Sequence, residues 1–153
     1  MDEIALRGVE PIVTGSRFAA DVIARLPDAL RAKQSLFEVT GGLHGAGLAR
    51  ADGELIAVRE DVGRHNAVDK ILGWAALNSD LSAAGEILVV SGRQSYELAQ
   101  KAVAGRWPVL AGVSAPSSLA IDLANQFGLT LIGFVRDGSF NVYSHPARIS
   151  VEG

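Results

Sequence analysis

The sequence predicts an α/β fold, a three-layer sandwich around a mixed sheet, and two observations lead to it. Segments with helical spacing of apolar residues alternate with strand-like runs in the order helix, hairpin, helix, strand, helix, strand, helix, hairpin. Residues 86–90 and 109–113 are continuous apolar runs, which is the pattern of strands buried on both faces. Right-handed crossovers between such strands place helices on both faces of the sheet.

The first helix is predicted over residues 16–26, where apolar residues recur at helical spacing behind the possible caps Thr14 and Ser16. Pro27 is expected to break or kink this helix, because a proline inside a helix loses one hydrogen bond and clashes with the preceding turn. A short helical continuation over residues 30–34 is expected to follow.

The first hairpin is predicted from residues 44–50 and 54–59, which flank Asp52-Gly53. Asp-Gly between two strand-like runs is a strong local hairpin signal. Beyond it, apolar residues between positions 68 and 75 follow the i, i+3, i+4, i+7 spacing of one helix face. That spacing predicts a helix that begins near Asn66 and ends near Asn78.

The remaining elements follow from the same patterns and from glycine stops. In order they are the strand 86–90, a helix through 98–103 that stops around Gly105, the strand 109–113, a helix through 119–127 with Gly128 as its C′ residue, and a hairpin of strands 129–135 and 140–143 around Asp137-Gly138.

Composition limits the classes of protein that this chain can represent. A length of 153 residues fits one domain, and 48% hydrophobic with 20% charged residues excludes a disordered chain. The net charge of -3 leaves no broad basic field, so no nucleic-acid partner is expected. The lack of Cys excludes disulfides, thiolate nucleophiles and cysteine-ligated metals in this chain. Residues 1–8 contain no apolar stretch, so no membrane anchor is expected there and a cytoplasmic location is the default.

The polar segments of the chain fall where an open α/β sheet binds ligands, which is beyond the carboxyl ends of its parallel strands. Residues 59–66, 91–93 and 114–118 each follow a predicted strand and precede a helix, and residues 40–44 are placed to form another wall. Backbone N–H groups at glycine turns and helix N-termini bind anions, and arginines add bidentate contacts to phosphate. We therefore predict a phosphate or nucleotide pocket there.

Each part of this pocket also has a simpler explanation. The polar cluster before the second helix is also consistent with a solvated turn, in which Asn66 and Asp69 act as an N-cap pair. The serines of the other two loops are also typical helix caps. With three scattered His and no Cys, a zinc site is not expected, and no Ser stands in a nucleophile-elbow sequence.

Five stretches of the sequence form a recognisable set: residues 37–44 (FEVTGGLH), 59–70 (REDVGRHNAVDK), 91–93 (SGR), 113–118 (VSAPSS) and 133–136 (GFVR). Together they resemble the FdhD/NarQ family of formate dehydrogenase accessory proteins, and the likeness covers residues 5–149. The resemblance implies a cytidine-deaminase-like fold, although the zinc signature of the deaminases is absent.

The resemblance also implies a function. Family members are sulfur carriers that accept sulfur from a cysteine desulfurase and pass it to the molybdenum cofactor of formate dehydrogenase. They bind that cofactor, bis-molybdopterin guanine dinucleotide, through its guanine nucleotide portion, so a GDP-like ligand is expected and no directly bound metal. The implied partners are the formate dehydrogenase catalytic subunit, the desulfurase and a second copy in a homodimer. The residues implied to line the pocket are Thr40, Gly41, Gly42, His44, Arg59, Asp61, Arg64, His65, Asn66, Ser91, Arg93 and Ser114.

The chain departs from the family pattern at one point. The family carries its sulfur on a Cys-x-x-Cys loop just upstream of the region that matches residues 5–8, and this chain has no Cys. A persulfide needs a thiol, so we expect residues 1–153 to be a single domain, the C-terminal cofactor-binding domain of a longer protein, that transfers no sulfur alone. Two alternatives are a stand-alone nucleotide-processing enzyme, with His65 as acid-base group and Arg64 on phosphate, and a non-catalytic interaction module for a dehydrogenase.

Overall fold

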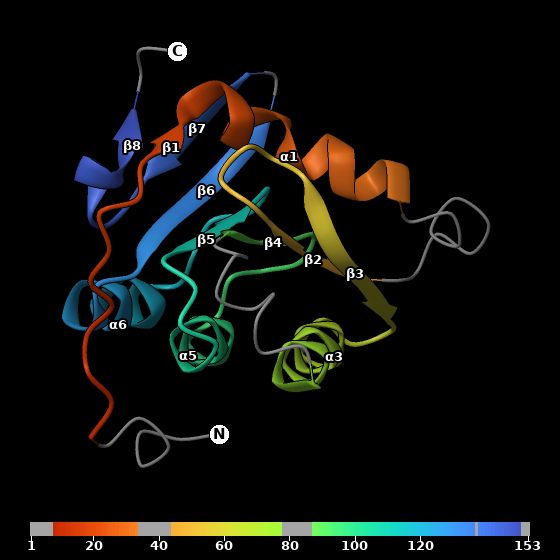
Figure 1. The fold of residues 1–153 in the computed structure, drawn as a ribbon, viewed down its shortest axis with the longest axis horizontal. Helices are drawn as coiled ribbons and strands as arrows, with labels where there is room; N and C mark the ends of the chain where they lie inside the picture. The colour runs from red at the N-terminus through yellow and green to blue at the C-terminus, as the bar shows by residue number, and fades with distance from the viewer. Residues whose placement is uncertain (1–7, 34–43, 78–86, 137, 151–153) are drawn as a thin grey trace.

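In the part of the chain that the structure describes, a six-stranded mixed sheet lies between α1 (Ala20–Lys33) on one face and α3 (Arg64–Leu77), α5 (Tyr96–Ala104) and α6 (Ser118–Phe127) on the other (Figure 1). The structure is a computed structural model that describes residues 8–33, 44–77, 87–136 and 138–150. The predicted α/β class with a mixed sheet is confirmed, whereas the cytidine-deaminase-like assignment stays a prediction.

The strand order of the sheet is β3-β2-β4-β5-β6-β7. The strands are β2 (His44–Ala49), β3 (Leu55–Asp61), β4 (Ile87–Val90), β5 (Val109–Gly112), β6 (Thr130–Arg136) and β7 (Ser139–Val142). β4, β5 and β6 are parallel, β2 is antiparallel to both β3 and β4, and β7 is antiparallel to β6. One edge of the sheet therefore contains the last residues of β3, β4, β5 and β6 together with the first residue of β2. We call this edge the carboxyl edge.

Both faces of the central strands are buried, as their continuous apolar runs predict. In β4, Ile87 and Val89 pack in the core under α1, whereas Leu88 and Val90 pack in the core beneath α3, α5 and α6. Side chains of a strand alternate between its two faces, so one short strand contributes to both cores. Because the central strands are buried on both faces, they hold the starting points of the loops at the carboxyl edge in fixed positions.

The N-terminal helix differs from its prediction in two respects. It begins at Ala20 rather than near Ser16, because Phe18–Ala19 form strand β1, which pairs in parallel with β8 (Ile149–Ser150). It also continues through Pro27, so the predicted break there is wrong. Leu26 and Leu30 are buried against the sheet on either side of the proline, and their packing offsets the lost hydrogen bond. Gln34, the predicted end, lies outside the described residues.

The other helices match their predictions more closely. Ser95 caps α5 by accepting a hydrogen bond from Leu98 N, and Ser117 caps α6 by accepting one from Ala120 N. Gly128 follows α6 with a φ of 74°, the left-handed conformation expected of a C′ glycine. α3 begins at Arg64, two residues before the predicted Asn66.

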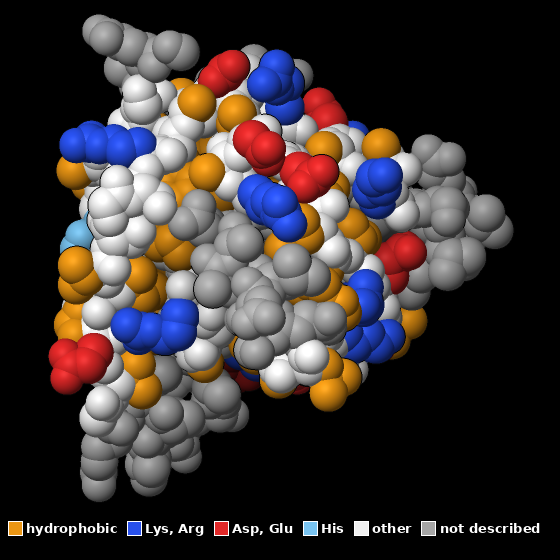
Figure 2. Space-filling view, viewed as in Figure 1, with side chains coloured by type: hydrophobic (Ala, Val, Ile, Leu, Met, Phe, Trp, Pro, Cys, Tyr) orange, Lys and Arg blue, Asp and Glu red, His pale blue; other side chains and the backbone are white. Residues whose placement is uncertain are grey.

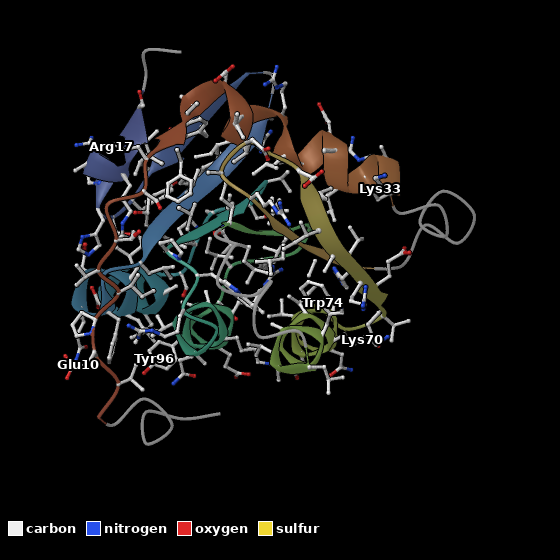
Figure 3. The ribbon with its side chains drawn as sticks, in the orientation of Figure 1. Glu10, Arg17, Lys33, Lys70, Trp74 and Tyr96 are labelled. Carbon is white, nitrogen blue, oxygen red and sulfur yellow. The ribbon has the colours of Figure 1, made fainter. Side chains whose placement is uncertain are left out.

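Arg148 holds together the opposite edge of the sheet, which we call the amino edge. This residue ends the short 3-10 helix η2 (Pro146–Arg148). Its guanidinium donates to the carbonyl oxygens of Pro108 and Gly128, which precede β5 and β6, and to that of Ile12. The segment that precedes α1 is thus tied to the sheet, and in Figure 3 it runs from Glu10 past α6 toward Arg17.

No helix in the described part of the chain is both long and apolar enough to cross a membrane.

Candidate functional site

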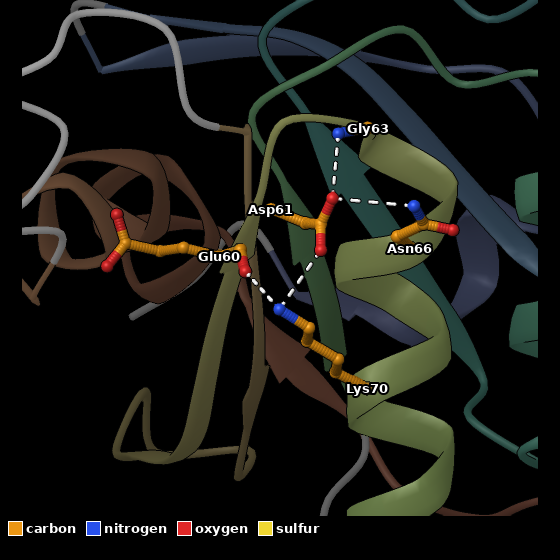
Figure 4. Close-up of polar contacts among 5 residues, drawn as sticks. All are labelled: Glu60, Asp61, Gly63, Asn66 and Lys70. Carbon is orange, nitrogen blue, oxygen red and sulfur yellow. Dashed lines mark hydrogen bonds and ion pairs between the residues drawn. The ribbon is translucent and has the colours of Figure 1, made fainter.

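Asp61 organises the loop between β3 and α3 (Figure 4). Its Oδ1 accepts hydrogen bonds from Gly63 N at 3.1 Å and from Asn66 Nδ2 at 3.4 Å. Its Oδ2 lies 3.0 Å from Lys70 Nζ, which also donates to the carbonyl oxygen of Glu60 at 2.8 Å. Asn66 therefore contacts the loop from inside the first turns of α3 and is not its N-cap, contrary to the simpler explanation given above.

These contacts favour the charged form of Asp61. The hydrogen bond from Gly63 N, followed by that from Lys70, lowers the pKa of Asp61 from 3.8 to about 2. The side chain is 20% exposed, so the carboxylate is largely shielded although it lies at the edge of the sheet. Its oxygens are occupied by Gly63 of the loop and by Asn66 and Lys70 of α3, which makes Asp61 a residue that shapes the site.

His44, Asp61 and Ser91 lie together at the carboxyl edge. His44 is directly opposite Asp61 in the antiparallel pair of β2 and β3, and cross-strand neighbours share one face of the sheet. Ser91 Oγ accepts a hydrogen bond from Gly45 N at 2.8 Å, and Ser91 N donates to Gly45 O at 3.0 Å. The loop after β4 is thereby joined to the start of β2.

Gln94 joins the next pair of loops, and sequence reasoning missed it. Its side chain is 1% exposed, and its Nε2 donates to Ser114 O at 3.0 Å. Its backbone carbonyl accepts from Ser117 N, and it forms an isolated parallel bridge with Pro116. Gln94 Oε1 is buried and has no hydrogen-bond partner within the described part of the chain. The sequence did offer one sign of its role, because Gln94 is a polar residue directly after Ser91-Gly92-Arg93 at the end of a strand.

A cavity of about 540 Å³ opens at the same edge on the α1 side of the sheet. Its walls come from α1 and from the ends of β5 and β6, with Val113, Ser114, Val135, Arg136 and Gly138 on the strand side. On the helix side Arg25, Asp28 and Arg31 are the charged residues. Of these lining residues only Ser114 was predicted as a site residue. The α1 arginines carry no motif in the sequence, so no local signal marks them.

The structure accounts for the remaining predicted residues as follows. Arg59 turns back on its own strand, where Nη1 donates to Val58 O at 2.7 Å. Arg93 is exposed in the loop after β4. The backbone of Arg64 and His65 forms the first turn of α3, but their side chains are outside what the structure describes. Thr40, Gly41 and Gly42 also lie outside the described residues.

In the ranges that the structure describes, no three His, Asp or Glu side chains gather as a metal site requires. The expectation that this chain binds no metal directly stays a prediction.

Fold and site together define a mixed-sheet α/β domain whose polar loops and cavity gather at the carboxyl edge of the sheet. The model of the FdhD/NarQ family matches residues 2–150, and the chain belongs to that family.

Similar proteins carry names consistent with this membership. The chain is 58% identical over 135 residues to "Sulfur carrier protein FdhD" of Nocardia farcinica, an alignment that covers 88% of this chain and 48% of that protein. It is 48% identical over 146 residues to the protein of the same name from Sulfolobus acidocaldarius, covering 95% and 58% of the two chains. The chain thus spans about half the length of the curated relatives it matches.

A solved structure also has the same fold. The chain superposes with a TM-score of 0.86 and 30% identity on a crystal structure from Desulfotalea psychrophila, described as that of a formate dehydrogenase accessory protein. The superposition covers 97% of this chain and 63% of that one.

Proposed function

We propose that this chain is the cofactor-binding part of a sulfur carrier required for formate dehydrogenase activity. In this role it binds the molybdenum cofactor, bis-molybdopterin guanine dinucleotide, through the guanine nucleotide portion. The cofactor is the substrate that receives sulfur, and a cysteine desulfurase is the donor. The partners are the desulfurase and the catalytic subunit of the dehydrogenase, and the protein acts as a homodimer.

The observation that carries this proposal is the convergence of three loops at the carboxyl edge. Gln94 joins the β4–α5 loop to the β5–α6 loop. Ser91 joins the β4–α5 loop to the start of β2, where His44 lies opposite Asp61 at the start of the β3–α3 loop. These loops lead into α3, α5 and α6, whose first N–H groups lack partners within their own helices and can donate hydrogen bonds to a ligand at this edge. The names of the relatives support the accessory role in formate dehydrogenase maturation.

Sulfur chemistry requires a group that this chain does not supply. Sulfane sulfur is carried on a thiolate, and the 153 residues contain no Cys. The proposed contribution of this chain is therefore to hold and orient the cofactor, while the persulfide is carried on a cysteine outside it.

Calorimetric titration of the chain with GDP tests the binding half of the proposal. We expect saturable binding that weakens in Arg93→Ala, because Arg93 is an exposed cation of the β4–α5 loop. Arg50→Ala is the matched control, since Arg50 follows β2 beside the hairpin turn at the amino edge, close to Glu54. Binding that is absent in the parent chain, or lost equally in both variants, contradicts the proposal.

Incubation with a persulfide-loaded cysteine desulfurase tests the other half. Mass spectrometry is expected to show no covalent sulfur on this chain, because no thiol is available. A sulfur adduct on the intact chain contradicts the assignment of the carrier group to a residue outside these 153.

A further inference from the structure

We propose that the cavity between α1 and the ends of β5 and β6 is an anion subsite that takes a phosphate or diphosphate group. Its described lining residues include three arginines and one aspartate, a local excess of positive charge in a chain whose net charge is -3. A charge excess opposite to that of the whole chain favours an anionic ligand. The inference rests on the proposed function in one respect, because the anion is taken to be the phosphate portion of the same ligand.

The helix wall of the cavity is one continuous face of α1. Ala24, Pro27, Asp28 and Arg31 follow the i, i+3, i+4, i+7 spacing that brings side chains to one side of a helix. Ala24 and Pro27 form an apolar wall, and Arg31 carries a guanidinium at its end. Figure 2 shows basic and acidic side chains in close succession along the part of the surface where α1 lies.

The arginines of α1 are only weakly engaged with their own carboxylates. Arg31 Nη1 lies 3.9 Å from Asp28 Oδ1, and Arg25 Nη2 lies 3.6 Å from Asp21 Oδ2, both beyond hydrogen-bond length. The Arg31 and Asp28 side chains are 62% and 84% exposed, so water screens the pair strongly. A ligand phosphate can therefore replace the carboxylate as the partner of Arg31, with bidentate geometry.

Arg136 provides the opposite wall. It is the last residue of β6, and no carboxylate in the described ranges pairs with it. Its guanidinium carbon lies 5.7 Å from the ring centroid of Phe134. Phe134 has a φ of 53° within the irregular register between Gly133 and Arg136. Such an irregularity at a strand end re-aims the side chains that follow it, and here Arg136 lines the cavity.

Ser114 connects this cavity with the loops on the other side of the sheet. It lines the cavity, and its carbonyl oxygen accepts the hydrogen bond from the buried Gln94. A nucleotide with its phosphates in the cavity thus has the β4–α5 loop beside its remaining part. This places the phosphates on the α1 side of the sheet, away from the first turn of α3.

Calorimetric titration with pyrophosphate tests the subsite. Arg31→Ala and Arg136→Ala are each expected to weaken pyrophosphate binding about tenfold or more, because each removes a charge-assisted contact. Asp28→Asn is expected to strengthen binding several-fold, since it removes the carboxylate that competes for Arg31. Arg50→Ala and Asp122→Asn change the charge equally at positions outside the cavity and are expected to leave binding unchanged.

The outcomes separate this inference from the proposed function. If GDP binds the parent chain but the two arginine variants and Asp28→Asn bind GDP and pyrophosphate as the parent does, the subsite is wrong and the function stands. If pyrophosphate binds with the predicted dependence but the parent chain does not bind GDP, the subsite stands and the function fails. If the parent chain binds no pyrophosphate, the subsite is overturned. If an arginine variant folds poorly, Asp28→Asn still tests the subsite, because pyrophosphate binding that does not strengthen in this variant contradicts it.

Discussion

The Lys70 ammonium lies 3.0 Å from the Asp61 carboxylate and joins the second turn of α3 to the last residue of β3. Lys70 also donates to Glu60 O, so one cation satisfies both a side chain and the backbone of the strand end. In Figure 3 Lys70 and Trp74 lie on the same helix, one turn apart. The pair fixes how α3 leaves the sheet, and with it the position of the β3–α3 loop at the carboxyl edge.

Asp61→Asn is expected to lower the free energy of unfolding at neutral pH, because the charged form of Asp61 is the one that its neighbours stabilise. The pKa of Asp61 is lowered from 3.8 to about 2, so this contribution is fully present above pH 3.8 and is lost as the pH falls through about 2. Thermal melts of parent and variant should therefore converge between pH 5 and pH 2. A difference in melting temperature that stays constant over this range contradicts the assignment, and Asp122→Asn on α6 is the control.

Arg148→Ala is expected to destabilise the chain by about 2 to 3 kcal/mol, because charged hydrogen bonds to several partly buried carbonyl groups are lost together. Urea denaturation measures this change. The control is Arg17→Ala, which removes one exposed hydrogen bond to Ala147 O. Since Arg148 lies at the amino edge, GDP affinity measured where the variant is folded should equal that of the parent. A loss of GDP affinity with unchanged stability would place the binding site at the amino edge and contradict the proposed carboxyl-edge site.

Gly128 and Gly138 provide a matched pair for the left-handed backbone. Their φ values are 74° and 78°, but a Cβ at Gly128 would lie 2.5 Å from Ile12 O, whereas a Cβ at Gly138 meets nothing within 4 Å. Gly138→Ala should therefore lower the free energy of unfolding only by the cost of the left-handed backbone, about 1–2 kcal/mol. Gly128→Ala should lower it by clearly more, because its Cβ also collides with Ile12 O. Equal destabilisation of the two variants in urea would mean that Ile12 moves away without cost.

The elements that local pattern determines were predictable from the sequence. The Asp52-Gly53 turn, the apolar runs of β4 and β5 and the Gly128 stop each depend on neighbouring residues, and each appears in the structure within a few residues of its prediction. The strand at Phe18–Ala19 was not predictable, because it depends on pairing with Ile149–Ser150 at the far end of the chain.

The candidate site divides in the same way. His44, Asp61 and Ser91 follow from the rule that loops meet beyond the carboxyl ends of strands, and the structure brings them together. The cavity arginines of α1 did not follow from any pattern, because only the packing of that helix over β5 and β6 brings them to this edge. Nothing in the spacing of Arg25 and Arg31 distinguishes them from the exposed charges of any amphipathic helix.

Backbone amide chemical shifts recorded during a GDP titration locate the ligand on the sheet. We expect the largest changes on the amides that close the carboxyl edge, namely those of Gly45, Gly63, Ser91 and Ser117. The amides of Thr130 and Leu131, which belong to the amino edge, should stay unchanged. Changes confined to the amino edge, or no changes at saturating GDP, would contradict GDP binding at the carboxyl edge.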